Sequence, residues 1–226
     1  LALGSAEAPL MEMTNAYAAF ANQGKQFENG LIIQVKDKFG KTIQSANNKS
    51  KQAITKEGAF LISSILSDNQ ARAPIFGSSL TVSGHTAAVK TGTTNDSRDA
   101  WTIGYNPKYA IGVWVGNNDN TAMASGGSDM AGPIWRNSMQ KLLAGQPDEK
   151  FAVPDGVIQK LVCSSNGGLA QNAGTGTFNE FFRAGALPTA TCKTPAKVTV
   201  CDLDNKRIVT IDDSELSDGN YSTDTS

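Results

Sequence analysis

Histidine is almost absent from this sequence, because His85 is the only one among 226 residues. It stands in Ser-Gly-His-Thr with no nucleophile elbow nearby, so a Ser-His-Asp hydrolase gains no support, and we expect a solvent-exposed turn residue. Cysteine is also scarce. Cys163, Cys192 and Cys201 have no metal-ligand spacing to one another or to the histidine, and we therefore predict neither a metal site nor a cofactor.

An excess of one charge and a long apolar run are lacking too. The 20 Lys and Arg residues balance 21 Asp and Glu residues, and no block of like charges could follow a phosphate backbone, so nucleic acid is not an expected partner. Every apolar stretch is interrupted well before the ~20 residues that a membrane-spanning helix needs. The chain opens with LALGSAEAPLMEM, without an initiator Met or a signal peptide. We expect a piece of a longer protein, in which any membrane attachment lies upstream.

The cysteines leave two possibilities open. A disulfide between Cys163 and Cys192 would close a loop of about 30 residues, stabilise the fold by ~3.5 kcal/mol and suit an oxidising compartment, with Cys201 left free. Three free thiols are an equal alternative.

The first half of the chain carries helix and hairpin patterns. In APLMEMTNAYAAFANQG the apolar residues recur at helical spacing, which predicts a helix between Pro9 and the stop at Gly24. The alternation in GLIIQVKDKFGKTIQ predicts a hairpin about a DKFGK turn, with the polar run SANNKSKQ as its loop. Thr55 is expected to cap a second helix, which ends at SDNQARAPIFG because Pro and Gly prevent its continuation.

Three strands, TAAVKTGTT, AWTIGY and YAIGVWVG, are predicted next, and the short turn at 106–108 makes the last two an antiparallel pair. A Gly-rich loop, SGGSDMAG, then leads into a final helix. After QPDEKFAVPDG the composition shifts to Gly, Thr, Asn and Ser. We predict one domain over 1–145 and an extension over 146–226, which contains a hairpin at KVTVCDLDNKRIVTI and a disordered tail, DGNYSTDTS.

The Lys-Thr-Gly-Thr run at 90–93 has the groups that a peptide substrate would need. Lys90 supplies a positive charge for a carboxylate or, as a catalytic residue, for an adjacent base, and the hydroxyls of Thr91 and Thr93 can donate hydrogen bonds to the carboxylate. Gly92 has no side chain, so a substrate backbone could lie alongside the strand. The Thr93 amide would then serve as one oxyanion donor. Lys-Thr-Gly is one of three motifs that mark penicillin-recognising serine enzymes.

The chain resembles the transpeptidase domain of class A penicillin-binding proteins in four successive stretches: LALGSAEAPLMEMTNAYAAFANQG, ILSDNQARAPIFG, VKTGTTNDSRDAWTIGYNP and IGVWVGNND. This resemblance implies an α+β fold of the β-lactamase and transpeptidase type, with an antiparallel sheet flanked by helices. It also implies a DD-transpeptidase that cross-links peptidoglycan stem peptides on the extracytoplasmic face of the bacterial membrane and is acylated by β-lactams. Residues 90–93 would hold the substrate carboxylate, and Thr93 would provide half of the oxyanion hole.

Two matches to the other family motifs are not interpreted as catalytic. The only Ser-x-x-Lys, from Ser138 to Lys141, follows Lys-Thr-Gly, whereas in the family it precedes it. A small residue packed in a helix and a snorkelling lysine explain it. The Ser-Asp-Asn at 67–69 lies at a helix end, where these residues are ordinary. We therefore expect the nucleophile and the second motif upstream of this chain, which alone would be inactive.

The remaining polar and aromatic residues near the motif have structural interpretations. Asp96, Arg98 and Asp99 are expected to pair and hold a turn, and Trp101 to pack, although it lies close enough to the motif to contact substrate. Whether Arg72 contacts the sheet or the site rim stays open. A β-lactamase, a DD-carboxypeptidase and a non-catalytic penicillin or cell-wall sensor are the alternative functions.

Overall fold

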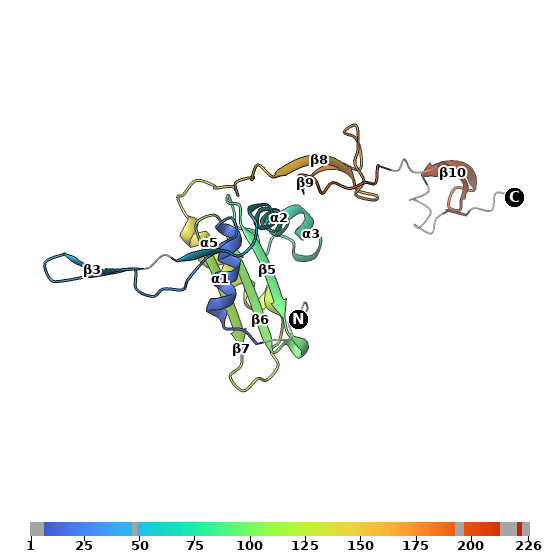
Figure 1. Ribbon diagram of the computed structural model, residues 1–226. Helices are drawn as coiled ribbons and strands as arrows, with labels where there is room; N and C mark the ends of the chain where they lie inside the picture. Colours follow the sequence, from blue (N-terminus) through green and yellow to red (C-terminus); the bar gives the residue numbers. More distant parts are fainter. Residues whose placement is uncertain (1–6, 47–48, 193–196, 213–220, 223–226) are drawn as a thin grey trace. The chain divides into compact units, whose positions relative to one another are not determined.

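The computed structural model describes residues 7–46, 49–192, 197–212 and 221–222, which divide into two compact units, Leu1–Ile158 and Gln159–Ser226 (Figure 1). Among these residues, no helix has the length and apolar character needed to cross a membrane. The predicted assignment of 1–145 to a transpeptidase part and of 146–226 to an extracytoplasmic extension stays a prediction.

The first unit alternates helices with short strands before its main sheet. Its elements are α1 (Leu10–Ala21), β1 (Lys25–Phe27), β2 (Gln34–Lys36), β3 (Thr42–Ser45), β4 (Ser50–Gln52), α2 (Lys56–Ser67), α3 (Asn69–Phe76), β5 (Ala88–Thr93), a 3₁₀ turn (Asn95–Ser97), β6 (Asp99–Tyr105), β7 (Ala110–Gly116), α4 (Gly127–Met130) and α5 (Gly132–Leu143).

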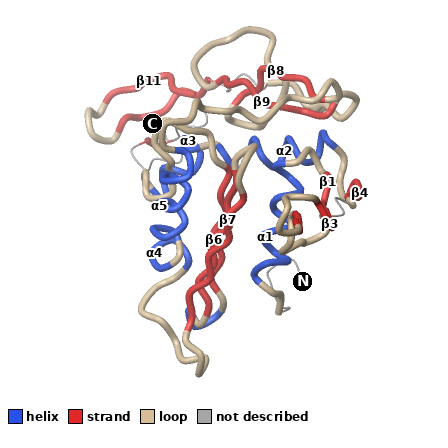
Figure 2. Tube along the Cα trace, turned by 90° about the vertical axis from the view of Figure 1, so that its left-hand side faces the viewer, coloured by secondary structure: helices blue, strands red, loops and turns tan. Residues whose placement is uncertain are grey.

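Strands β5, β6 and β7 form a three-stranded antiparallel sheet in that order. Helices α1 and α2 cover one face of this sheet, and α4 and α5 cover the other (Figure 2). The predicted α+β fold, with an antiparallel sheet flanked by helices, is confirmed.

The face of the sheet under α5 holds the apolar core. Trp135 and Met139 are fully buried there and pack with Val89 of β5. The indole lies so close to Gly104 that a Cβ at that position would come within 2.3 Å of the ring. The glycine therefore allows α5 to approach β6.

The opposite face is built around Tyr105, which is fully buried. Its ring stacks on Phe20 of α1 and meets Phe151 edge to face, at centroid distances of 6.1 and 5.6 Å. The Tyr105 hydroxyl lies 3.0 Å from the hydroxyl of Ser63 on α2. Burial raises the pKa of Tyr105 to about 12, and the hydrogen bond with Ser63 opposes this rise.

The raised pKa predicts an alkaline loss of stability. The unfolded chain ionises Tyr105 near its ordinary value of 10.0, whereas the folded chain keeps the proton up to about 12. The contribution of the protonated Tyr105 to the free energy of unfolding is therefore fully present below pH 10 and is lost as the pH rises to about 12. The free energy of unfolding, measured with urea at several pH values in this range, should fall more steeply with pH for the wild type than for Tyr105→Phe. Tyr109→Phe is the control, and equal slopes for wild type and Tyr105→Phe would contradict the prediction.

Most predicted elements of the first unit are confirmed, but three segments differ. Part of the predicted Gly-rich loop SGGSDMAG forms α4. Part of the run predicted as a loop, SANNKSKQ, forms β4, which pairs with β1. The stretch SDNQARAPIFG ends α2 and also contains a separate short helix, α3. The Asp68 carboxylate accepts hydrogen bonds from Gln70 and Ala71 and starts α3, which contains Pro74 and ends at Gly77, where φ is +54°.

The second unit consists of small antiparallel pairings. Strand β8 (Val157–Cys163), which begins at the end of the first unit, pairs with β9 (Thr177–Arg183). Strand β10 (Lys197–Asp202) pairs with β11 (Arg207–Asp212), which confirms the predicted hairpin. Strand β12 (Tyr221–Ser222) pairs with β10, so the prediction of disorder is wrong for these two residues. The rest of the predicted disordered tail, 218–220 and 223–226, lies outside the described residues.

All three cysteines are free thiols. The thiols of Cys163 and Cys192 nevertheless form a hydrogen bond, which lowers the pKa of Cys163 and raises that of Cys192. The backbone brings them together, since the Cys163 amide donates to Gly168 and the Cys192 amide donates to the adjacent Leu169.

This proximity predicts that Cys163 and Cys192 pair under oxidising conditions, whereas Cys201 stays reduced. The thiolate of Cys163 attacks a disulfide of the glutathione type, and Cys192 then displaces the bound thiol, so that two thiols of the chain are lost and two thiols of the reagent are released. Thiol counting after denaturation without reductant should return one free thiol per chain. Three would contradict the pairing.

Candidate active site

The outer edge of β5 carries the Lys-Thr-Gly-Thr run and pairs with no other strand of the described part of the chain. The Val89 carbonyl accepts a hydrogen bond from Arg72 at 3.5 Å, and the Thr91 carbonyl accepts one from the Lys90 Nζ at 2.5 Å. Both carbonyls therefore point away from β6. Backbone groups alternate in direction along a strand, so the N–H of Thr93 faces the same open edge.

The next residue confirms this alternation, because the Thr94 amide donates to the Asp99 carbonyl at 3.1 Å and so points toward β6. Asp99 also fixes the end of the strand through its carboxylate, which accepts hydrogen bonds from the Thr94 hydroxyl and the Trp114 indole, each at 2.8 Å. Asp96 and Arg98 form an exposed ion pair at 3.7 Å. The predicted role of these charged residues in holding the turn is confirmed.

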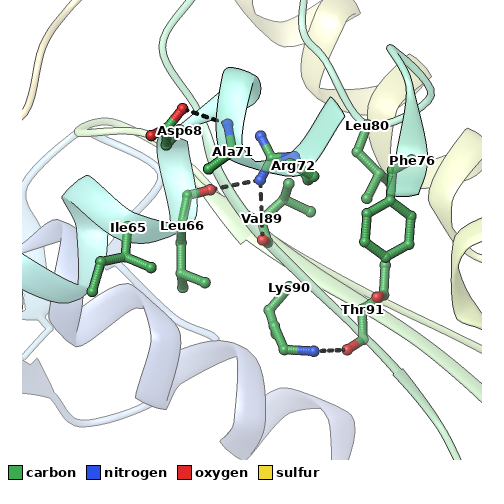
Figure 3. A pocket seen from close by; sticks show the side chains of 10 residues that line it. All are labelled: Ile65, Leu66, Asp68, Ala71, Arg72, Phe76, Leu80, Val89, Lys90 and Thr91. Atoms are coloured by element: carbon green, nitrogen blue, oxygen red, sulfur yellow. Dashed lines mark hydrogen bonds between the residues drawn. The ribbon is translucent and has the colours of Figure 1, made fainter. Parts of the chain in front are cut away.

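A groove of about 230 Å³ lies along this edge, between β5 and the corner formed by α2 and α3 (Figure 3). It combines an apolar floor with a few charged and polar side chains. Its lining residues are Ile65, Leu66, Asp68, Ala71, Arg72, Phe76, Leu80, Val89, Lys90 and Thr91.

Arg72 joins the helical corner to the strand. Besides the Val89 carbonyl, its guanidinium binds the Leu66 carbonyl at 2.7 Å and the Asn69 side chain at 2.5 Å (Figure 3 shows the two carbonyl contacts). Burial lowers its pKa, and the nearby Asp68 opposes this shift. The sequence left the contacts of Arg72 open, and the structure places it both on the sheet and in the groove. The Asp68 carboxylate caps α3, and the Asn69 side-chain oxygen accepts the hydrogen bond from Arg72.

Lys90 and Gly92 face the α1 side of the sheet. The Lys90 side chain is exposed and, within the described residues, forms no ion pair. A Cβ added to Gly92 would meet only the Cβ of Trp101, at an ordinary contact distance of 3.4 Å. The packing of the chain itself thus does not require glycine at position 92. Trp101 lies directly opposite on β6 and is half-buried.

The start of α4 supports Thr93 from the other face of the sheet, a contact that was not predicted from the sequence. The Gly127 amide donates to the Thr93 Oγ1 at 2.9 Å, and the buried Thr102 hydroxyl donates to the Gly127 carbonyl at 3.0 Å. Gly126 also has no room for a side chain, because its Cβ would come within 2.5 Å of the Thr93 Oγ1. The Gly-Gly pair in SGGSDM was visible in the sequence, but its contact with β5 was not.

Two other candidates are separate from this edge. Ser138 lies half-buried on α5, whose apolar residues pack into the core, and Lys141 is exposed. No hydrogen bond joins the two in the described part of the chain. His85 lies in a turn, as predicted, but the prediction of solvent exposure is wrong. Its side chain is half-buried, and the buried Nδ1 finds no partner among the described residues.

The edge strand with Lys-Thr-Gly-Thr, the groove beside it and the helices on both faces of the sheet are features of the family of penicillin-recognising serine enzymes. A family model, the penicillin binding protein transpeptidase domain, matches residues 2–140. The chain belongs to this family, and the prediction of a class A penicillin-binding protein is confirmed.

Relatives and solved structures agree with this assignment. The chain is 33% identical over 215 residues to penicillin-binding protein 2D of Bacillus subtilis, and the alignment covers 91% of this chain and 31% of that protein. It is 32% identical over 165 residues to penicillin-binding protein 1A of Neisseria lactamica, covering 70% and 21%. The crystal structure of penicillin-binding protein 1A from Haemophilus influenzae superposes with a TM-score of 0.73 at 28% identity, covering 84% of this chain and 34% of that one. The chain thus spans about a fifth to a third of these proteins.

Proposed function

We propose that the intact protein is a serine DD-transpeptidase that cross-links peptidoglycan stem peptides on the extracytoplasmic side of the bacterial membrane, and that β-lactams acylate it. A serine outside this chain attacks the carbonyl between the two terminal D-alanines, the last D-alanine leaves, and the amine of a second stem peptide attacks the acyl-enzyme. Any attachment to the membrane belongs to the remainder of the protein, and nucleic acid is not a partner.

The open edge of β5 is the observation that supports this proposal. A stem peptide can lie along it as an added strand, since the Thr91 and Thr93 backbone groups face outward and Gly92 has no side chain that would project from the strand between them. The Thr93 amide supplies half of the oxyanion hole. Lys90, Thr91 and Thr93 hold the terminal carboxylate, which is the feature shared by stem peptides and penicillins.

The test uses the intact protein with a stem peptide that ends in D-Ala-D-Ala. We expect release of D-alanine together with a cross-linked product, and inhibition of both by labelled penicillin that becomes covalently attached. Gly92→Ala should keep its fold but lose about tenfold or more in both reactions, because the new methyl group occupies the path of the substrate strand.

Each other outcome points to a different function. D-alanine release without a cross-linked product would indicate a carboxypeptidase. Penicillin hydrolysis with turnover would indicate a β-lactamase. Penicillin binding without a covalent product would indicate a sensor. Any of these three results would overturn the proposal.

A further inference from the structure

The Thr93 hydroxyl accepts a hydrogen bond but donates none within the described residues. Its Oγ1 accepts the Gly127 N–H at 2.9 Å, and no acceptor for its hydroxyl hydrogen lies among the described residues. A threonine hydroxyl has one hydrogen to donate and two lone pairs to accept with. Because Gly127 occupies a lone pair, the hydrogen stays available to an acceptor from outside the chain. The donated N–H also polarises the O–H bond and strengthens it as a donor.

The segment that makes this contact, Gly126 and the first residue of α4, Gly127, fits closely against the sheet. A Cβ on Gly127 would lie 2.4 Å from the Gly92 carbonyl oxygen and 2.6 Å from that of Trp101, both of which are backbone atoms. A Cβ on Gly126 would instead meet the side chain of Thr93, at 2.5 Å from Oγ1 and 3.0 Å from Cγ2. Gly127 thus sets the distance between the start of α4 and β5, whereas Gly126 leaves room for one orientation of the Thr93 side chain.

We propose that Gly126 and Gly127 are positioning residues that hold the Thr93 hydroxyl in the orientation in which it donates to the substrate carboxylate. The inference rests on the proposed function of residues 90–93. The glycines themselves touch no substrate. They act through the Thr93 side chain, so their effect should require both that side chain and a carboxylate on the substrate.

The test measures the acylation rate of the intact protein with benzylpenicillin and with its methyl ester, which lacks the carboxylate. The wild type should react faster with the acid. Gly126→Ala pushes Thr93 off its rotamer and should slow the acid about tenfold, with little change for the ester. Gly30→Ala is the matched control, because no atom lies within 4 Å of its added Cβ. It should change neither rate.

A double-mutant cycle with Thr93→Ala separates positioning from general damage. If Gly126 acts through Thr93, Gly126→Ala in the Thr93→Ala background costs no more than about twofold. The inference would be overturned if Gly126→Ala slowed acylation as much in the Thr93→Ala background as in the wild type. It would also be overturned if Gly126→Ala lowered the acid rate and the ester rate equally. Equal rates of the wild type with acid and ester would instead overturn the assignment of residues 90–93 itself.

A second variant serves if Gly126→Ala does not fold. Thr102→Val removes the hydroxyl that holds the Gly127 carbonyl at 3.0 Å. It should lower the ratio of the acid rate to the ester rate in the same direction, though by less. An unchanged ratio in this variant would likewise count against the proposal.

Discussion

Replacing Lys90 by alanine in the intact protein is expected to lower the rate of acylation by penicillin at least tenfold, or by ~1.4 kcal/mol in the barrier. The ammonium group is exposed at the edge of β5 and has no carboxylate partner among the described residues, so its positive charge stays available to a substrate carboxylate. Among the described residues, it donates a hydrogen bond to the backbone carbonyl of Thr91. A substrate oxygen can replace that contact at little cost.

The control for this prediction is Lys51→Ala. Lys51 is also an exposed lysine and lies on β4, away from the main sheet, so the two variants lose the same charge. Only Lys90→Ala should slow acylation, measured as the time course of a labelled penicillin adduct. Thermal unfolding of both variants should match that of the wild type, because neither side chain is buried. Unchanged acylation by Lys90→Ala would show that residues 90–93 do not bind the carboxylate.

The order of elements could be predicted from local patterns. The helical spacing of apolar residues gave α1, and the alternation on either side of the turn at 106–108 gave β6 and β7, because both patterns follow directly from the geometry of one element. The Lys-Thr-Gly-Thr run could be placed on a strand for the same reason. Its position at the sheet edge depends on which strands pair, and the sequence alone did not establish that pairing.

Features that depend on contacts between distant residues were missed. The support of Thr93 by Gly127 joins positions 34 residues apart and leaves no local pattern. Helix α3 was missed because Pro74 suggested a break. Proline removes one N–H and clashes with the carbonyl four residues earlier, but the Asp68 cap satisfies two amides at the start of this short helix, and Pro74 stands close to its end. His85 was misjudged because burial of a turn residue depends on what packs over it.

The chain as given should form no covalent adduct with penicillin. Acylation needs a serine whose proton is taken by a neighbouring base, and the chain has one Ser-x-x-Lys, at 138–141. It lies on α5, which turns Trp135, Met139 and Leu143 into the core and packs on β6 and β7. No hydrogen bond between Ser138 and Lys141 is present in the described residues. Among the described residues, the open edge of β5 therefore has the groups that we propose to bind substrate but no activated hydroxyl beside it.

Intact-mass spectrometry after incubation with penicillin tests this prediction, with Ser138→Ala as the matched variant. Both proteins should keep their original masses. The variant removes only an oxygen from a half-buried position, so its fold should be unchanged and any difference in mass shift would be due to the hydroxyl. A stoichiometric adduct on the wild type that disappears in Ser138→Ala would make this serine a nucleophile. It would also contradict the inference that the acylated serine of the transpeptidase lies outside these 226 residues.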